Sequence, residues 1–299
     1  MKSPARMLLA IPCALALVAT PTAAWSADPP KTPAPATTAA KTTTTAAAAA
    51  AAAAKTTTSD KAKSAAKVAP VNCAKVKCIA LTFDDGPGRY ADKLLDTFKK
   101  YNSKATFFLE GQYVKSRPAF AKRMAVEGHD LGNHSYTHPH LRELDEGKIR
   151  EELTRTQDIV KQVTGKSPTM IRPPYGELDE RVKAIAEEMG MPIVLWNGGS
   201  RDWATKNEKA IYDEVLKNAK RDGVILMHDW VEQTVKVMPK LLTALQKQGY
   251  HVVAVSSLRG AKQLKAADIY PVGSEKDKEL PSETPYEGAE SAESPADDF

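Results

Sequence analysis

The sequence predicts an α/β fold with a parallel sheet of about seven strands, joined by helices where the connections are long enough. Short apolar runs alternate with amphipathic segments of helical period across residues 78–255. Polar residues gather at the carboxyl ends of the apolar runs, where α/β barrels build their sites. The number of strands suits an irregular barrel better than an open sheet, and the pattern leaves the closure of that barrel open.

The elements follow one another in a regular order. The first predicted strand, residues 78–83, precedes a helix over 90–101 with Leu94, Leu95 and Phe98 on one face. Two of the later helices end at glycines, which adopt the left-handed conformation that closes a helix. Further strands are predicted at 106–109, 129–132, 169–172, 193–196, 223–227 and 250–255, and further helices at 118–127 (before Gly128), 149–164 (before Gly165), 179–189, 208–219 and 237–248.

The N-terminus has the order of a secretory signal peptide. Lys2 and Arg6 precede an apolar run over residues 7–19, and small residues follow. This run is shorter than the roughly 20 residues of a membrane-spanning helix. We therefore expect residues 1–27 to be a signal peptide that is removed on export, and the mature protein to be secreted, extracellular or cell-wall associated.

Two further segments differ in composition from the folded region. Residues 28–70 are mainly Ala, Thr, Pro and Lys, which predicts a disordered linker. Residues 271–299 form an acidic tail that is also expected to be disordered. One catalytic domain remains between them, at residues 71–270.

The charge distribution argues against nucleic acid as a partner. The formal net charge of +5 combines a lysine-rich N-terminal segment with an acidic C-terminus. The middle is nearly balanced and has no arginine-rich helix or basic surface interleaved with aromatic residues. We expect a monomer that binds neither nucleic acid nor, once the signal peptide is removed, a membrane.

The cysteines predict a disulfide. Cys13 lies in the expected signal peptide, which leaves Cys73 and Cys78 after export. A pair this close in the sequence of an exported protein favours a small disulfide loop, with two free thiols as the alternative. No second Cys or His pair stands nearby at a spacing typical of a zinc site.

Two adjacent acids follow the first strand. Asp84 and Asp85 stand where the chain leaves the sheet, so one can bind a metal while the other faces a substrate. The alternative is a plain turn, because Asp-Gly-Pro at residues 85–87 is turn chemistry.

Two histidines follow the third strand. If residues 134–138 form a helical turn, His134 and His138 share a face and can bind one divalent cation. Together with Asp85 they offer two imidazoles and one carboxylate, a set that leaves coordination positions open. We interpret His140 as a surface or supporting residue. His129 and His251 are expected to be structural.

Other strand ends also deliver polar residues. Arg172 begins a rigid Arg-Pro-Pro-Tyr-Gly loop, and its guanidinium suits a carboxylate. A buried strand ends at His228. Asp202 and Trp203 close a further segment that begins at Trp196.

Five motifs therefore occur in order along the chain. They are Thr-Phe-Asp-Asp-Gly-Pro, His-Ser-x-x-His, Arg-Pro-Pro-Tyr-Gly, Ser-x-Asp-Trp and Leu-x-His, within residues 78–256. Together they resemble the polysaccharide deacetylase family (carbohydrate esterase family 4, the NodB-homology domain) over essentially the whole folded region. The resemblance implies a distorted (β/α) barrel, one divalent metal ion (usually zinc or cobalt) and the removal of acetyl groups from polysaccharides.

The resemblance also implies roles for the motif residues. Asp84 is then the general base, and Asp85, His134 and His138 are the metal ligands. The other assigned residues are Arg172, which orients Asp84; Tyr175, whose backbone N–H stabilises the oxyanion; and His228, the general acid, with Asp202 as its partner. The residues assigned to substrate binding are Trp203, Leu226, Pro173 and Tyr175.

Two positions depart from the family pattern. Gly199 stands where the fourth motif usually has an Asp, and His140 stands where Asn or Asp is commoner. Because the missing Asp has no part in proton transfer, we expect Gly199 to affect the specificity of the groove more than the activity.

These observations predict a hydrolase that releases acetate from the N-acetyl groups of GlcNAc-containing glycans, either peptidoglycan or chitin-type chains. One alternative is an O-acetyl esterase on the same scaffold, for example on acetylated xylan. A second alternative is a catalytically inactive glycan-binding protein. The joint presence of Asp84, the three ligands and His228 argues against the second, because binding a sugar needs no such combination.

Overall fold

The computed structural model describes residues 71–274. Its strands are β1 (Lys77–Gly86), β2 (Thr106–Leu109), β3 (Asp130–Asn133), β4 (Ile193–Val194), β5 (Gly198–Gly199), β6 (Gly223–His228), β7 (Tyr250–Val252) and β8 (Ile269–Tyr270). Its α-helices are α1 (Ala91–Lys100), α2 (Gly111–Ser116), α3 (Pro118–Val126), α4 (Glu146–Thr164), α5 (Glu180–Glu188), α6 (Asp202–Thr205), α7 (Glu208–Asn218) and α8 (Glu232–Lys247). The expected signal peptide, the linker and most of the acidic tail lie outside the described residues. Within the described range, no helix is long and apolar enough to cross a membrane.

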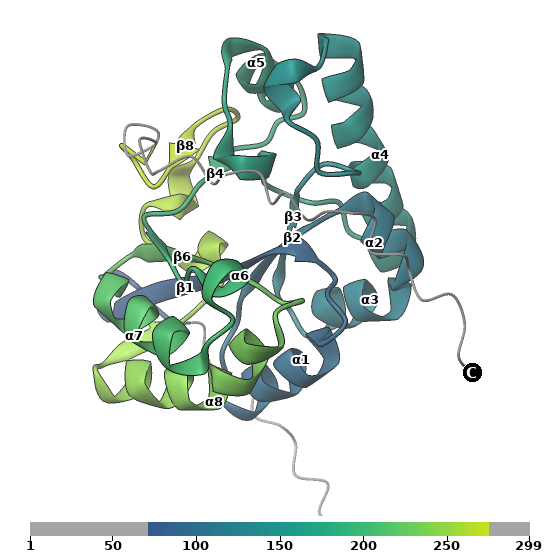
Figure 1. Ribbon diagram of the computed structural model, residues 1–299. Coiled ribbons are helices and arrows are strands. Elements are labelled where there is room, and N and C mark those ends of the chain that lie inside the picture. The colour runs from purple at the N-terminus through teal and green to yellow at the C-terminus, as the bar shows by residue number, and fades with distance from the viewer. Residues whose placement is uncertain (1–70, 275–299) are drawn as a thin grey trace, which may run out of the picture. The chain divides into compact units, whose positions relative to one another are not determined.

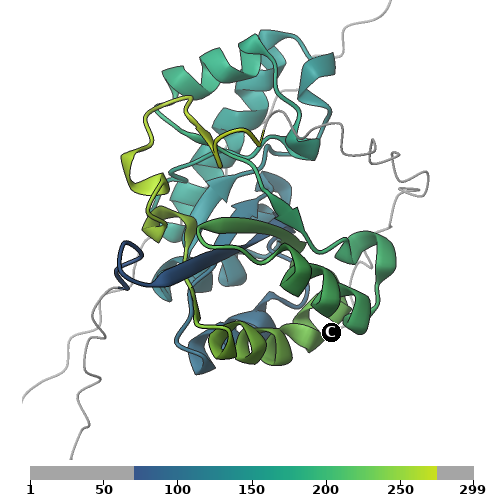
Figure 2. The ribbon, with the colours of Figure 1, turned by 90° about the vertical axis from the view of Figure 1, so that its left-hand side faces the viewer.

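The strands form a distorted parallel barrel. The alternation of strands and helices predicted the parallel pairing, and the family resemblance implied the distorted barrel. Every strand pair within residues 71–274 is parallel. The main sheet has the order β3-β2-β1-β6-β5, and β4 pairs with β8. Single bridges from Ile171 to Asn133 and to Ile193 connect the two sheets. β4 and β5 belong to one chain segment, residues 193–199, which bridges to Ile171 at its beginning and pairs with β6 at its end, so it links the two sides of the main sheet (Figures 1 and 2).

The alternation of side chains along β1 separates the helix-facing core from the barrel interior. Ile79, Leu81 and Phe83 are fully buried in a cluster that includes apolar residues of α1 and α8, which lie along one side of the strands (Figure 1). Full burial of each such side chain stabilises the fold by about 1.5–3 kcal/mol. Successive strand residues point to opposite faces, so Thr82 and Asp84 face the interior.

The helix ends follow from local sequence. Gly165, with φ of 73°, closes α4 as predicted, and Gly128, with φ of 78°, follows α3. At the other ends, side-chain oxygens accept from backbone N–H groups: Asp145 from Lys148 in α4, Asp179 from Val182 in α5, and Asn207 from Ala210 in α7. Such caps satisfy N–H groups that have no partner within the helix.

Several boundaries differ from the sequence expectation. The predicted strand at 169–172 is only a bridge at Ile171, because Pro173 and Pro174 have no N–H to extend a ladder. The helix predicted at 237–248 begins earlier, at Glu232, and contains Pro239. The strands predicted at 193–196 and 250–255 are shorter in the structure, where they form β4 and β7. The elements α2, α6, β5 and β8 were not predicted, because two to six residues carry too little periodicity.

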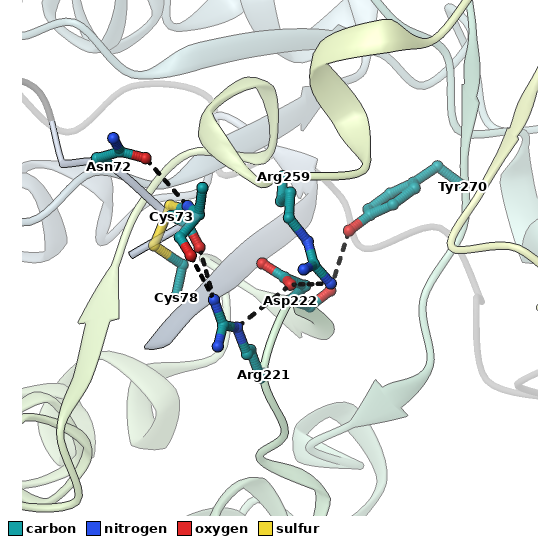
Figure 3. The surroundings of a disulfide bond; sticks show 8 residues. Asn72, Cys73, Cys78, Arg221, Asp222, Arg259 and Tyr270 are labelled. Carbon is teal, nitrogen blue, oxygen red and sulfur yellow. Dashed lines mark hydrogen bonds and ion pairs between the residues drawn. A yellow bond between two sulfur atoms is a disulfide. The ribbon is translucent and has the colours of Figure 1, made fainter. Parts of the chain in front are cut away.

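The predicted disulfide is present between Cys73 and Cys78. It closes a short loop at the start of β1, and both cysteines are buried. Figure 3 shows Arg221 beside it, where the guanidinium donates to the carbonyls of Cys73 and Ala74 at 3.0 and 3.1 Å. Arg221 stands just before β6, so this contact joins the beginnings of two neighbouring strands.

Removing the disulfide is expected to lower stability moderately. The bonded residues are five apart in sequence, and closing so short a loop reduces unfolded-state entropy by an amount worth about 2 kcal/mol. Replacing both cysteines with serine should lower the free energy of unfolding by that amount in urea denaturation. Reductant should destabilise the parent chain to the same level and leave the double variant unchanged. A parent chain that is insensitive to reductant would contradict the expectation.

Candidate active site

The end of β1 places two carboxylates beside one histidine. Asp84 is 3% exposed, and the ladder between β1 and β2 shifts register between Phe83 and Gly86. Asp85 lies in this irregularity with φ of 60°. Bulges of this kind redirect side chains near active sites. As a result Asp84 Oδ2 lies 3.7 Å and Asp85 Oδ1 3.3 Å from Nε2 of the same residue, His134.

Asp85, His134 and His138 form a candidate metal site. One ligand-type atom from each lies within 4.8 Å of the others. Asp85 Oδ1 is 3.4 Å from His138 Nε2. This oxygen is buried and has no hydrogen-bond partner, which is the state expected of an atom that binds a cation. A carboxylate and two imidazoles are a ligand set of catalytic zinc sites, so the residues present fit the expected divalent ion.

The electrostatics of Asp85 and His138 suit a cation, and the two carboxylates attract positive charge to His134. Burial alone raises the pKa of Asp85, but the surrounding imidazoles of His138, His134 and His228 lower it below its ordinary value. Burial lowers the pKa of His138 to about 4, so this ring is neutral near pH 7. Burial opposes charge on His134, whereas Asp84 and Asp85 raise its pKa. His134 Nδ1 lies 2.6 Å from the carbonyl oxygen of Arg172, and donation there leaves Nε2 facing Asp85.

The two ligand histidines do not share a helical turn. Residues 134–138 are irregular, and Ser135 and His138 have φ of 63° and 60°. The backbone N–H groups of Tyr136 and Thr137 donate to Glu152 of α4, each at 2.8 Å. Because the side chain of Glu152 accepts hydrogen bonds from these N–H groups, they do not need the partners that a helix would provide. The prediction that the imidazoles of His134 and His138 lie close together is confirmed. The helical turn expected for residues 134–138 is absent.

Arg172 is fully buried and points at Asp84. Its Nη1 donates to Asp84 Oδ1 at 2.7 Å and to Thr82 Oγ1 at 2.8 Å. Its Nε and Nη2 donate to the carbonyls of Val194 and Leu195 at 2.9 and 2.8 Å. The guanidinium therefore donates hydrogen bonds to four acceptors, which fix its position, and it in turn fixes the orientation of Asp84.

His228, the register partner of Asp84 in the neighbouring strand β6, forms a buried pair with Asp202. His228 Nδ1 lies 2.8 Å from Asp202 Oδ1, and Asp202 Oδ2 accepts from the His228 backbone N–H and from Thr234 Oγ1. Burial opposes charge on His228, but Asp202, followed by Asp85 and Asp84, raises its pKa to about 10. His228 Nε2 lies 3.7 Å from Asp85 Oδ2, which directs a charged imidazolium at the site.

Tyr175 lies at the exposed rim. It has φ of 56° and is 38% exposed. Its ring stacks on His140 with centroids 4.0 Å apart and meets His138 edge-on at 4.6 Å. His140 also lies 3.2 Å from Glu177, so it supports Tyr175, in agreement with the supporting role expected for it.

The remaining predicted residues are placed as follows. Leu226 precedes His228 by two positions in β6, so both face the interior, and Leu226 is 8% exposed. Pro173 is buried, and Trp203 in α6 is partly exposed. Gly199 pairs with Leu226, and a Cβ built on Gly199 would meet nothing within 4 Å. The missing Asp of the fourth motif would therefore fit at this position.

Sequence reasoning missed several polar residues around the ligands. Glu110, directly after β2, is buried, and burial and Asp85 raise its pKa to about 8. Asp229 and Trp230 follow His228 and contact the loop after β1. All three stand at the carboxyl ends of strands, so the rule that found Asp84 also identifies them. Glu152 gave no such signal, because it lies on a helix sixteen residues from Tyr136.

His129 and His251 stay away from the site. His129 is buried and accepts from the Ala105 backbone N–H, and burial lowers its pKa to about 3. His251 is exposed in β7. Both placements agree with the structural roles predicted for them.

Comparisons of this chain with known proteins agree on one family. Residues 71–194 match the family model described as polysaccharide deacetylase. The peptidoglycan-N-acetylglucosamine deacetylase PgdA of Listeria monocytogenes is 40% identical over 201 residues, which are 67% of this chain and 42% of PgdA. The chain thus matches less than half of PgdA. A peptidoglycan-N-acetylglucosamine deacetylase of Bacillus cereus is 37% identical over 61% of this chain and 88% of its own length.

A solved structure agrees with this relationship. The structure described as T48 deacetylase with substrate is 38% identical and has a TM-score of 0.64. The match covers 67% of this chain and 99% of that one. The five motifs, the parallel barrel and these similarities lead to one conclusion: the chain belongs to the polysaccharide deacetylase family.

Proposed function

We propose that this chain is a metal-dependent deacetylase that hydrolyses N-acetyl groups of GlcNAc-containing glycans and releases acetate. The observation that carries the proposal is the arrangement around Asp85, His134 and His138. These residues would hold the zinc or cobalt ion. A buried carboxylate, Asp84, lies 3.7 Å from the ligand His134, and a charged histidine, His228, lies 3.7 Å from the ligand Asp85.

The proposed chemistry assigns each neighbouring residue one task. When bound, the divalent cation supplies Lewis acidity toward the acetyl carbonyl. Asp84, oriented by Arg172, accepts a proton from the attacking water as the new carbon–oxygen bond forms. The backbone N–H of Tyr175 donates to the oxyanion, a contribution typically worth about 3–4 kcal/mol.

His228 completes the reaction as the general acid. The carbon–nitrogen bond breaks, and His228 transfers its proton to the departing amine nitrogen. Asp202 keeps the imidazole charged for this step. An amine is a poorer leaving group than an alcohol and needs this proton more. The charged His228 therefore favours an amide substrate over an ester.

Peptidoglycan is the proposed substrate because the relatives named above are peptidoglycan deacetylases. Leu226 is assigned to the acetyl-methyl pocket, and Pro173 and Trp203 to the sugar groove. Chitin-type oligosaccharides offer the same N-acetyl group and remain the second substrate to test.

Export is part of the proposal. Residues 1–27 have the composition of a signal peptide. The Cys73–Cys78 disulfide is of the kind that persists in an oxidising compartment. A monomer working at the cell wall fits these features.

Acetate release tests the proposal. The purified chain is incubated with peptidoglycan, chitooligosaccharides and acetylated xylan, after treatment with a chelator and again after zinc or cobalt is restored. We expect release from a GlcNAc glycan that stops with chelator and returns with metal. Preference for acetylated xylan would indicate the O-acetyl esterase. No release from any substrate by metal-loaded protein would indicate an inactive glycan-binding protein.

A further inference from the structure

The second carboxylate oxygen of Asp85 has a partner outside the set of residues assigned above. Trp230 Nε1 donates to Asp85 Oδ2 at 3.2 Å. The other oxygen, Oδ1, has no hydrogen-bond partner and faces Nε2 of His134 and His138 at 3.3 and 3.4 Å. The two oxygens are thus distinguished by their surroundings: one is held by an indole, and the other is directed at the two imidazoles.

The position of Trp230 is fixed by the contact between two strand ends. Asp229, fully buried, accepts from the Gly88 backbone N–H at 2.9 Å. A Cβ on Gly88 would lie 2.5 Å from both Asp229 Oδ1 and the Trp230 backbone nitrogen. The loop that follows Asp85 and the end of β1 and the residues after β6 therefore touch at their backbones. The indole also lies beside the His228 ring, with centroids 5.6 Å apart.

We infer that Trp230 is a positioning residue for the metal site, an inference that rests on the proposed function. Its N–H holds Oδ2 and so selects the orientation of Asp85 in which Oδ1 alone is offered to the cation. A carboxylate that binds through one oxygen leaves more coordination positions for water and substrate. Hydrogen bonds of this kind to ligating side chains typically contribute about 10- to 100-fold to metal affinity or activity.

Zinc affinity of the full chain tests the inference. Trp230→Phe retains an aromatic ring but removes the N–H donor. Competition with a chromophoric zinc chelator measures affinity without using activity. We expect Trp230→Phe to bind zinc about 10- to 100-fold more weakly than the parent chain. Trp203→Phe loses the same donor from a residue whose indole makes no hydrogen bond to Asp85, His134 or His138 in the described structure, so its affinity should be unchanged.

The outcomes separate this inference from the proposed function. A parent chain that binds no zinc would refute the metal site and with it the proposed function. If the parent chain binds zinc and Trp230→Phe binds it equally well, only the role of Trp230 is refuted. If Trp230→Phe lowers the melting temperature of the zinc-free chain but leaves zinc affinity unchanged, Trp230 has a purely structural role, and the inference is refuted. Should Trp230→Phe not fold, Trp230→Leu, which equally lacks a donor, replaces it.

Discussion

Asp84→Asn is expected to lower kcat for acetate release by about 10²- to 10⁴-fold, the usual contribution of a general base. The amide has nearly the same shape as the carboxylate and can still accept from Arg172, which lies 2.7 Å from Asp84 Oδ1. It cannot take up the proton of the attacking water. Folding and zinc binding should therefore change little, and the loss should appear in kcat rather than in metal content. Steady-state rates at saturating zinc provide the measurement.

The neighbouring acid provides the control for this experiment. Asp85→Asn makes the same chemical change, a carboxylate to an amide, at the adjacent residue. Asp85, however, belongs to the candidate metal site. We expect it to lose zinc affinity together with activity. The two variants thus distinguish a base from a ligand. An Asp84→Asn enzyme within about threefold of the parent rate would rule out the assigned role, since a base contributes far more.

Arg172→Met is expected to lower the free energy of unfolding by about 3–5 kcal/mol, the cost of removing one partner of a buried ion pair. The guanidinium is fully buried. Its removal leaves the carbonyls of Val194 and Leu195 without their donor and Asp84 without its counter-charge. Denaturation in urea measures the loss. Arg172→Lys should also destabilise the fold, because an ammonium lacks the planar set of donors that meets four acceptors.

An exposed arginine provides the comparison for this loss. Arg150 forms a 2.7 Å ion pair with Glu188, and both side chains are largely exposed. Exposed pairs of this kind typically contribute about 0–1 kcal/mol, so Arg150→Met should change stability within that range. Equal losses in Arg150→Met and Arg172→Met would show that the buried network contributes no more than a surface pair.

The sequence predicted those parts of the molecule that repeat a simple period. β2 was placed at its observed bounds, because the apolar residues Phe107, Phe108 and Leu109 directly follow the β-branched Thr106. The site residues at strand ends were found for the same reason: once a strand is located, its carboxyl end is known. The parallel barrel then brings Asp84 and His228 together as partners in adjacent strands.

Features that depend on contacts distant in sequence were not predictable. The backbone of residues 134–138 is set by Glu152, and no periodicity links that helical residue to the loop. The bond from Trp230 to Asp85 joins residues 145 apart and depends on the close approach of two loops. β5 and β8 have two residues each, too few for any alternation to appear.

The buried guanidinium of Arg172 has a consequence for how this chain can evolve. It joins the end of β1 to the chain at Val194 and Leu195 and also holds the carboxylate assigned as the base. A substitution of Arg172 is therefore expected to lower both the activity and the stability of the chain, so selection acts against it for two reasons. New substrate preferences should arise instead at the rim, through positions such as Tyr175 and Gly199, where change leaves this cross-link intact.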